Sequence, residues 1–295
     1  MTGIRRIATA WLAGAALSLQ LPGPALADWR ADIGTFRIGV VSPDGQRAVP
    51  GMELVRDAFS KALGMPVEVF VARDFPALVD AQASGRIEYA VYSALAYAAA
   101  ARLCDCVEPI AAPVGQDGAT GTRSILVLRQ GLPAGVVPQV AIAAAQTDLA
   151  GPAAFLATGP GVPEIRRRIV ENMEAAEALF VSGEVDGIIG WLATGPDGDQ
   201  ERSGTAARLE SLGRQPSAHT IAWRGPVLAY GPHTVRRSLD PQARKALAGL
   251  LAGMAATKPD VLEALSPLHP GGFRAVGPID YATASEALEA VLKTE

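Results

Sequence analysis

The chain has 295 residues, of which 49% are hydrophobic, and its 26 Lys and Arg against 30 Asp and Glu give a formal net charge of −4. The charges are dispersed apart from one short basic run, Arg166–Arg168, so the chain lacks the basic stripe typical of nucleic-acid-binding proteins. A chain of this length buries a large core and commonly divides into two domains. We therefore expect a mildly acidic globular protein that binds no nucleic acid.

The first 27 residues have the order of features of a secretory signal peptide. Two arginines precede the almost wholly apolar stretch Ile7–Leu21, a Pro-Gly-Pro turn breaks it, and Ala25–Ala27 is a small-x-small cleavage signature. The alternative is a membrane anchor, but about 15 apolar residues are short for a hydrocarbon core that needs about 20. No Cys directly follows the apolar stretch that could carry a lipid anchor. We expect cleavage near Ala27 and a mature protein that starts near Asp28.

Strand and helix alternate three times in the first part of the mature chain. Short β-branched runs predict buried strands, and apolar residues at helical spacing predict helices. Asp74 and Ser93 are placed to cap the second and third helices. This alternation predicts a parallel sheet with crossover helices. The expected strands are 35–41, 67–71 and 88–92, and the expected helices are 51–63, 74–85 and one that begins after 93.

A second α/β series begins near residue 124 and is followed by a helical tail. We interpret Arg166–Arg168 as the solvated face of a helix, and the Gly- and Asp-rich stretch Thr194–Thr205 as a polar loop. Strands are expected at 124–128, 140–144, 185–190, 220–223 and 226–230, and helices from about 151 and at 174–180, 243–255, 259–265 and 282–292.

The strand-to-helix turns are the segments in which a binding site is expected. In open α/β sheets, ligands bind beyond the carboxyl ends of the strands, where backbone N–H groups of the following helices converge. The turns in question are 42–46, 72–75, 92–95, 146–151 and 190–193.

Both cysteines of the chain lie together in Cys104-Asp105-Cys106. In an oxidising compartment, two thiols this close favour a local disulfide. Free thiols and a metal or redox role remain alternatives, because bridge geometry is specific and a three-residue ring is tight. Two thiolates alone make an incomplete metal site, and His219, His233 and His269 lie far away in sequence. We expect neither a metal nor a cofactor.

A set of short motifs follows in order along the chain and spans residues 36 to 292. The motifs are Ala72–Leu78, Ala83–Ala90, Tyr92–Tyr97, Val107–Ile110, Gly118–Ser124, Ser182–Asp186 and Pro278–Tyr281. In their order and spacing they resemble the PhnD-like periplasmic phosphonate-, phosphite- or phosphate-binding components of ABC transporters.

The resemblance implies an α/β architecture, the type II periplasmic-binding-protein fold, with two lobes that close on a small anion. Each lobe then holds a mixed, mainly parallel sheet flanked by helices. We expect the first part of lobe 1 at 28–125, lobe 2 at 126–222, and a return to lobe 1 with C-terminal helices at 223–295. The resemblance also implies a periplasmic monomer whose partners are a small-molecule ligand and an ABC permease of the inner membrane.

Carried over residue by residue, the resemblance places Tyr92 on an aromatic position that contacts ligand in the family. Phe75 stands where the family usually has Tyr, which removes a hydroxyl donor. Thr147 is the hydroxyl retained where the family has a Ser-Thr-Ser-Gly helix start. Ser42 and Ser93 belong to the strand-to-helix turns and complete the expected first half of the site.

Other positions depart from the family in ways that bear on the ligand. Met173 stands where the family has a phosphonate-binding His, and Ala193 and Gly225 stand near positions where some members carry carboxylates for an amino group. A dianion would lose several charge-assisted hydrogen bonds, each worth about 1.5–3 kcal/mol. We therefore expect a phosphonate-like or substituted anion.

Two further residues are candidates for ligand contact in the second lobe. Trp191, with Trp223, lies near the predicted interlobe positions, where it would suit an apolar or aromatic ligand; ordinary core packing is the alternative. Arg123, or else Arg224, is available for an anionic group such as a carboxylate.

No sequence motif calls for catalysis, so we expect no catalytic residue and no enzyme activity. P-loop, GxSxG, HExxH and paired CxxC patterns are absent from the sequence. The expected function is a solute receptor for an ABC permease. The alternatives are a ligand-sensing accessory protein that signals to a membrane histidine kinase or another envelope partner, and a redox or metal protein acting through Cys104 and Cys106.

Overall fold

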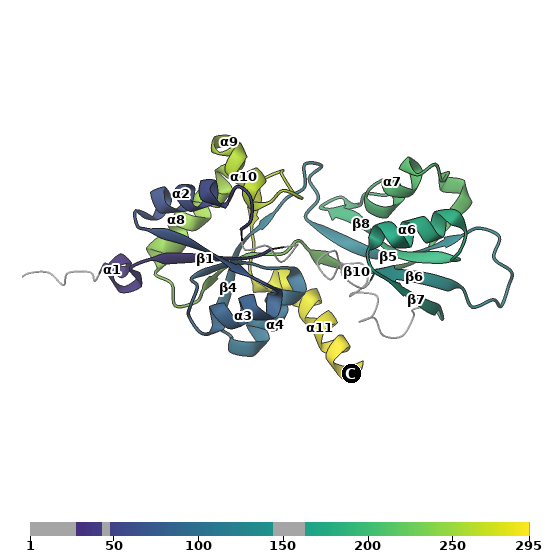
Figure 1. Cartoon of the computed structure of the whole chain (residues 1–295), viewed down its shortest axis with the longest axis horizontal. Helices are drawn as coiled ribbons and strands as arrows, with labels where there is room; N and C mark the ends of the chain where they lie inside the picture. The colour runs from purple at the N-terminus through teal and green to yellow at the C-terminus, as the bar shows by residue number, and fades with distance from the viewer. Residues whose placement is uncertain (1–27, 43–47, 144–162, 295) are drawn as a thin grey trace, which may run out of the picture.

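Two α/β lobes lie side by side in the computed structural model, which describes residues 28–42, 48–143 and 163–294 (Figure 1). The N-terminal part of the chain builds one lobe, the middle part builds the other, and the C-terminal part returns to the first. Each lobe is organised around one sheet that carries helices. Among the described residues, no helix combines the length and the apolar character needed to cross a bilayer.

The first lobe begins with the strand–helix alternation that the sequence predicts. Three parallel strands pair in the order β2-β1-β3, and each is followed by a helix. Asp74 and Ser93 cap their helices as expected, because their side chains accept hydrogen bonds from the N–H groups of Ala77 and Ala96. The elements are α1 (Trp29–Ile33), β1 (Phe36–Val41), α2 (Met52–Leu63), β2 (Val67–Ala72), α3 (Phe75–Ala83), β3 (Tyr89–Val91) and α4 (Ala94–Cys104).

The C-terminal part of the chain completes this sheet. β11 lies between β3 and β4 and is antiparallel to both, so the order is β12-β4-β11-β3-β1-β2. β1 to β4 therefore point the same way, and the sheet is mixed, with two parallel and three antiparallel pairings. The added elements are β4 (Val107–Pro113), β11 (His233–Arg236), α8 (Pro241–Ala252), α9 (Met254–Thr257), α10 (Pro259–Leu265), β12 (Phe273–Ala275), the 3₁₀ turn η2 (Pro278–Tyr281) and α11 (Ala282–Thr294).

Helices cover both faces of the first sheet (Figure 1). On one face, Phe36 and Ile38 of β1 are fully buried in a core that includes Phe59 of α2 and Leu247 of α8. On the other face, α3, α4 and α11 enclose a second core around Leu78. Alternate residues of a strand point to opposite faces, so burial on both faces accounts for the apolar run Ile38–Val41 in β1.

The second lobe contains a sheet with the strand order β10-β5-β8-β6-β7, and the short β9 pairs with β8. β6 is parallel to β7 and β8, and β5 is antiparallel to β8 and β10. Phe180 and Leu209 from the two helices close the core over this sheet. The elements are β5 (Gly121–Arg129), β6 (Gln139–Ala143), β7 (Arg166–Val170), α6 (Met173–Ser182), β8 (Gly187–Gly195), β9 (Gly198–Asp199), α7 (Gly204–Ser211), the 3₁₀ turn η1 (Pro216–Ala218) and β10 (His219–Ala229).

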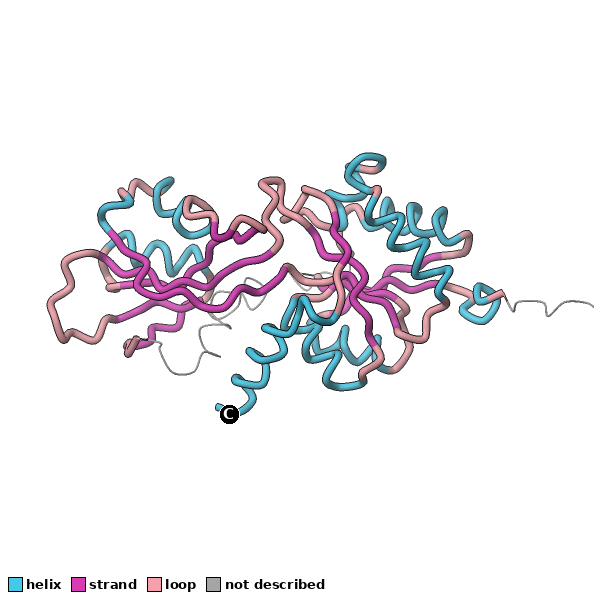
Figure 2. Tube along the Cα trace, turned by 180° about the vertical axis from the view of Figure 1, so that it is seen from behind, coloured by secondary structure: helices cyan, strands magenta, loops and turns pink. Residues whose placement is uncertain are grey.

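Two antiparallel strands, β5 and β10, carry the chain into and out of the second lobe (Figure 2). Their register runs from Gly121 opposite Ala229 to Arg129 opposite His219. The expected lobe limits at 125/126 and 222/223 fall inside β5 and β10. Both strands pair within the second sheet over their whole length. The exact lobe limits stay a prediction.

Local structure differs from the sequence prediction at several places. Arg166–Arg168 is not part of a helix but of the edge strand β7, where pairing with β6 on one side leaves the arginine side chains solvated. The stretch 194–205 is not all loop, because it includes the end of β8, all of β9 and the start of α7. The two runs at 220–230 form one strand, β10, whose bulges accommodate Pro226. The helix expected from about 151 lies outside the described residues.

The motif Pro278–Tyr281 fastens the C-terminal segment to the connection between the lobes. Asp280 accepts a hydrogen bond from the Gly277 N–H at 2.8 Å and pairs with Arg274 at 3.0 Å. The buried Tyr281 hydroxyl donates to the Tyr230 carbonyl oxygen at 2.9 Å, directly after β10.

We expect Tyr281→Phe to lower the melting temperature by about 2–6 °C, since it leaves the buried Tyr230 carbonyl without this donor, at a cost of about 1–2 kcal/mol. Tyr281→Leu should cost more, because it also removes the edge-to-face contact with Tyr97, whose ring centroid lies 4.8 Å away. Calorimetry of the three proteins measures both effects. Identical melting of Tyr281→Phe and wild type would contradict this role.

Candidate functional site

A cavity of about 310 Å³ opens in the first lobe at the carboxyl ends of β1 and β3. This is the edge of a parallel sheet at which α/β proteins bind ligands. Its wall combines residues from widely separated parts of the chain. They are Val40, Val41, Val49, Met52, Phe75, Val91, Tyr92, Ser93, Pro113, Gly231, His233, Ala264, Leu265, Ser266, Pro267, Leu268 and His269.

Two helices begin at this cavity, and each already has a side-chain cap. The Asp74 carboxylate accepts from the Ala77 N–H at 2.8 Å at the start of α3. The Ser93 hydroxyl accepts from the Ala96 N–H at 3.2 Å at the start of α4. The negative charge of Asp74 offsets the positive end of α3, whereas the neutral cap leaves the positive end of α4 uncompensated. The start of α4 is therefore the better place for an anionic group.

Tyr92 is held between β3 and the segment that returns from the second lobe. Its ring is buried, its hydroxyl donates to the Leu78 carbonyl at 3.4 Å, and its N–H donates to the Pro232 carbonyl at 3.0 Å. Burial raises the pKa of the hydroxyl, so it remains a neutral donor at physiological pH. Gly231 passes so close that a Cβ there would collide with the Tyr92 carbonyl oxygen, which requires glycine at this position.

Both histidines of the cavity wall are neutral at physiological pH. His233 is buried, and its Nδ1 lies 2.5 Å from the Tyr89 hydroxyl. Complete burial lowers the pKa of His233 to about 3. Burial likewise lowers the pKa of His269 to about 4, against a weaker opposite effect of Asp117. Of the wall residues that the structure describes, none therefore carries a charge at neutral pH.

The structure brings three of the predicted site residues together: Phe75, Tyr92 and Ser93 line the same cavity. Ser42 is buried at the end of β1, and its N–H donates to the Ala72 carbonyl at 3.4 Å; it is not among the residues of the wall. Thr147 lies outside the described residues. A binding role for each of these residues stays a prediction.

The two predicted residues of the second lobe have other partners in this structure. Arg123 pairs with Asp199 at 2.8 Å and donates to the Gly225 carbonyl at 2.6 Å. Trp191 is half-buried and packs in a small apolar cluster with Ala193 and Tyr230. Neither lines the cavity of the first lobe.

Asp199 pairs with two arginines of the second lobe, Arg123 and Arg224, the latter at 3.0 Å, and Arg224 also pairs with Glu201 at 2.9 Å. Burial acts to raise the pKa of Asp199, but hydrogen bonds from Arg123 and Thr194 and the charges of both arginines outweigh it and hold that pKa below its ordinary value. Asp199 is therefore ionised at neutral pH. An anion bound by Arg123 would have to compete with this carboxylate.

Sequence reasoning missed the C-terminal contribution to the cavity, Ala264–His269, and treated His233 and His269 as isolated. His269 stacks on Tyr230 with ring centroids 3.6 Å apart and an interplanar angle of 20°. These residues reach β1 and β3 because the chain returns to the first lobe. No local sequence pattern predicts this return.

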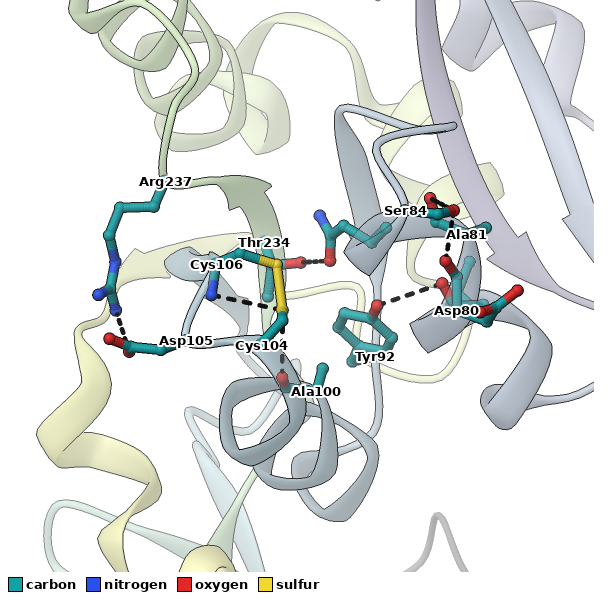
Figure 3. Close-up of a disulfide and its surroundings, with 12 residues drawn as sticks. Asp80, Ala81, Ser84, Tyr92, Ala100, Cys104, Asp105, Cys106, Thr234 and Arg237 are labelled. Carbon is teal, nitrogen blue, oxygen red and sulfur yellow. Dashed lines mark hydrogen bonds and ion pairs between the residues drawn. A yellow bond between two sulfur atoms is a disulfide. The ribbon is translucent and has the colours of Figure 1, made fainter.

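The cysteines form a disulfide at the far end of α4 from the cavity (Figure 3). Asp105 between them adopts a left-handed conformation with φ of 46° and pairs with Arg237 at 3.0 Å. A helix of 11 residues, about 16 Å long, separates the bridge from Ser93. In the described part of the chain, no group of three or more His, Cys, Asp or Glu could hold a metal ion.

The family model described as "ABC transporter, phosphonate, periplasmic substrate-binding protein" matches residues 38–281. This match covers both lobes and the site. The chain belongs to this family. It is therefore a periplasmic substrate-binding component of the ABC transporter type, with the two-lobed fold that its sequence motifs indicate. A search of curated proteins finds no significant match.

Solved structures of the same fold cover nearly the whole chain. A protein from Xanthomonas citri bound to chloride ion is 14% identical, with 89% of this chain and 100% of that one covered and a TM-score of 0.62. PhnD1 from Prochlorococcus marinus in complex with methylphosphonate is 13% identical, with 88% and 99% covered and a TM-score of 0.56. The periplasmic aliphatic sulphonate binding protein of Escherichia coli is 13% identical, with 88% and 87% covered and a TM-score of 0.50.

The neutral state of His233 predicts a pH dependence of stability. Its folded pKa lies below the value of about 6.5 in the unfolded chain, so the unfolded state takes up the proton first. The stabilisation is present above about pH 6.5 and is lost as the pH falls toward 3, with a slope of up to about 1.4 kcal/mol per pH unit. Urea unfolding between pH 7.5 and 4.5 measures it.

The matched control is His233→Gln, which retains a polar partner for Tyr89 but does not titrate. The difference in the free energy of unfolding between wild type and variant should shrink as the pH falls. Parallel curves for the two proteins over this range would refute the assignment.

Proposed function

We propose that this protein binds a small phosphonate-like or substituted anion between its two lobes and delivers it to an ABC permease of the inner membrane. The observation that carries the proposal is the cavity at the carboxyl ends of β1 and β3, beside the positive end of α4. Family membership supports the transport role. The methylphosphonate bound to PhnD1 from Prochlorococcus marinus supports the ligand class.

In this proposal the oxyanion lies at the start of α4. The first N–H groups of the helix point toward it, the Ser93 hydroxyl acts as a neutral donor, and the Tyr92 ring contacts the ligand. Thr147 and Arg123 would contribute from the second lobe, and Phe75, Ser42 and Trp191 would shape the site around the ligand. Closure of the lobes would then exclude water and strengthen these hydrogen bonds.

The protein is proposed to act as a monomer without catalytic activity, cofactor or nucleic-acid partner. We also propose that residues 1–27 are a signal peptide cleaved near Ala27, as their sequence indicates. No observation favours the alternative of a sensory accessory protein. Stimulation of the ATPase activity of a reconstituted permease by the loaded protein is the corresponding assay.

Ligand binding should be accompanied by compaction of the molecule. Calorimetric titration with phosphate, methylphosphonate, phenylphosphonate, methanesulfonate, benzenesulfonate and benzoate should identify at least one ligand. Small-angle scattering with that ligand should show a smaller radius of gyration. If no compound of the panel binds and none changes the radius of gyration, the proposed function is wrong.

Phe75→Tyr should raise the affinity for methylphosphonate by about tenfold or more, because it adds a hydroxyl donor to the cavity wall and a hydrogen bond to a charged group is worth about 1.5–3 kcal/mol. The matched control is Phe70→Tyr, the same change on β2 outside the cavity wall, where the ring lies under Arg86. The control should leave the affinity unchanged. Equal effects of the two substitutions would argue against a role for position 75.

A further inference from the structure

We propose that the cavity of the first lobe is a subsite for an uncharged hydrocarbon group, so that the ligand is an oxyanion carrying an aryl or branched-alkyl substituent. The inference rests on the proposed function and specifies its substrate class. Inorganic oxyanions and amino-substituted phosphonates are then poor ligands, because the first cannot fill the cavity and the second would place a cation in it.

The chemistry of the cavity wall carries the first step of the argument. Among the described residues, its side chains are predominantly aliphatic or aromatic and include no Lys, Arg, Asp or Glu. Its two histidines are neutral, as their low pKa values show. A charged group moved into such surroundings loses its hydration without a counter-charge in return. A hydrocarbon group gains about 25 cal/mol for each Å² of apolar surface buried.

The size of the cavity carries the second step. An apolar protein cavity of about 150 Å³ is enough to bind benzene. The cavity here has about 310 Å³, at the lower end of the range for ligand sites of about 300–1,000 Å³. A phosphate or methylphosphonate ion would leave much of it empty, whereas a phenyl or branched-alkyl group would fill it.

The polar groups at the cavity show how such a ligand would lie. The Ser93 hydroxyl and the first N–H groups of α4 supply neutral donors at one place in the wall, beside the Tyr92 ring. Val40, Met52 and Leu265 supply buried apolar surface elsewhere in it. This separation fits a ligand with an anionic head at α4 and a hydrocarbon group in the cavity.

The loop after α10 forms the side of the cavity that depends on the C-terminal part of the chain. Ser266 and His269 close it into a turn, because the Ser266 hydroxyl donates to the His269 carbonyl and the His269 N–H donates to the Ser266 carbonyl, both at 3.2 Å. The His269 ring is stacked on Tyr230. Within this turn, Leu268 lines the cavity yet is 75% exposed, so an apolar group bound beside it would cover an otherwise solvated leucine.

The test compares phenylphosphonate with methylphosphonate by calorimetric titration of the full mature chain. These probes share the same head group and differ in apolar surface. We expect phenylphosphonate to bind about 30-fold more tightly, from the additional apolar area of its ring. Inorganic phosphate should bind more weakly than either.

A matched pair of surface substitutions places the effect in the cavity. Leu268→Ser should reduce the preference for phenylphosphonate over methylphosphonate about fivefold, because it removes apolar surface from the cavity wall. Ile279→Ser makes a similar change at a residue that is 83% exposed and outside the cavity wall, and should leave the preference unchanged. Both sites are exposed, and circular dichroism verifies that both variants fold.

The outcomes distinguish failure of the apolar subsite from failure of the proposed function. Methylphosphonate or phosphate binding as tightly as phenylphosphonate would overturn the apolar subsite and leave the proposed function standing. Equal loss of preference in both serine variants would also overturn it. Failure of every phosphate, phosphonate, sulfonate and carboxylate probe would overturn the proposed function, and the subsite with it.

Discussion

The antiparallel ladder between β5 and β10 is the constraint on which the rest of the molecule depends. Both passages of the chain between the lobes are hydrogen-bonded to one another there. The Tyr230 N–H extends the pairing by donating to the Thr120 carbonyl at 3.0 Å, and Arg123 joins the two strands through the Gly225 carbonyl. Any rotation of the lobes must therefore be absorbed where this ladder ends and the first sheet begins. The cavity wall lies beside that place, since it includes Pro113 and Gly231.

Charge is distributed so that the described residues of the site include no cation without a carboxylate partner. In the second lobe, Asp199 and Glu201 together neutralise Arg123 and Arg224, and in the first lobe the histidines of the cavity wall are uncharged. Family membership indicates a substrate-binding protein, yet these residues favour hydrogen bonding by neutral groups over ion pairing.

The sequence was sufficient for those elements whose signals are local. The strands and helices between residues 36 and 104, the caps Asp74 and Ser93, and the helical tail follow from periodicity and capping chemistry. Local signals failed at β4, β11 and β12, which are short or contain proline and are defined by pairing with distant strands. They also failed at β7, where three adjacent arginines give no periodicity to distinguish strand from helix.

The site was also predictable only where its residues have local sequence signals. Phe75, Tyr92 and Ser93 follow strand ends, so topology alone brings them together at one edge of the sheet. The wall formed by Ala264–His269 depends on a tertiary contact between the C-terminal segment and the connection of the lobes, visible in the stacking of His269 on Tyr230. The partner of Arg123, Asp199, lies 76 residues away in sequence and could not be inferred from spacing.

The position of β11 between β3 and β4 has a consequence for biogenesis. The polypeptide is synthesised from its N-terminus, so the whole second lobe is made before the strand that joins the two halves of the first sheet. Until residues 233–236 arrive, the facing edges of β3 and β4 lack their partner and could pair with other chains. The lobe that is begun first is thus the one that finishes folding last.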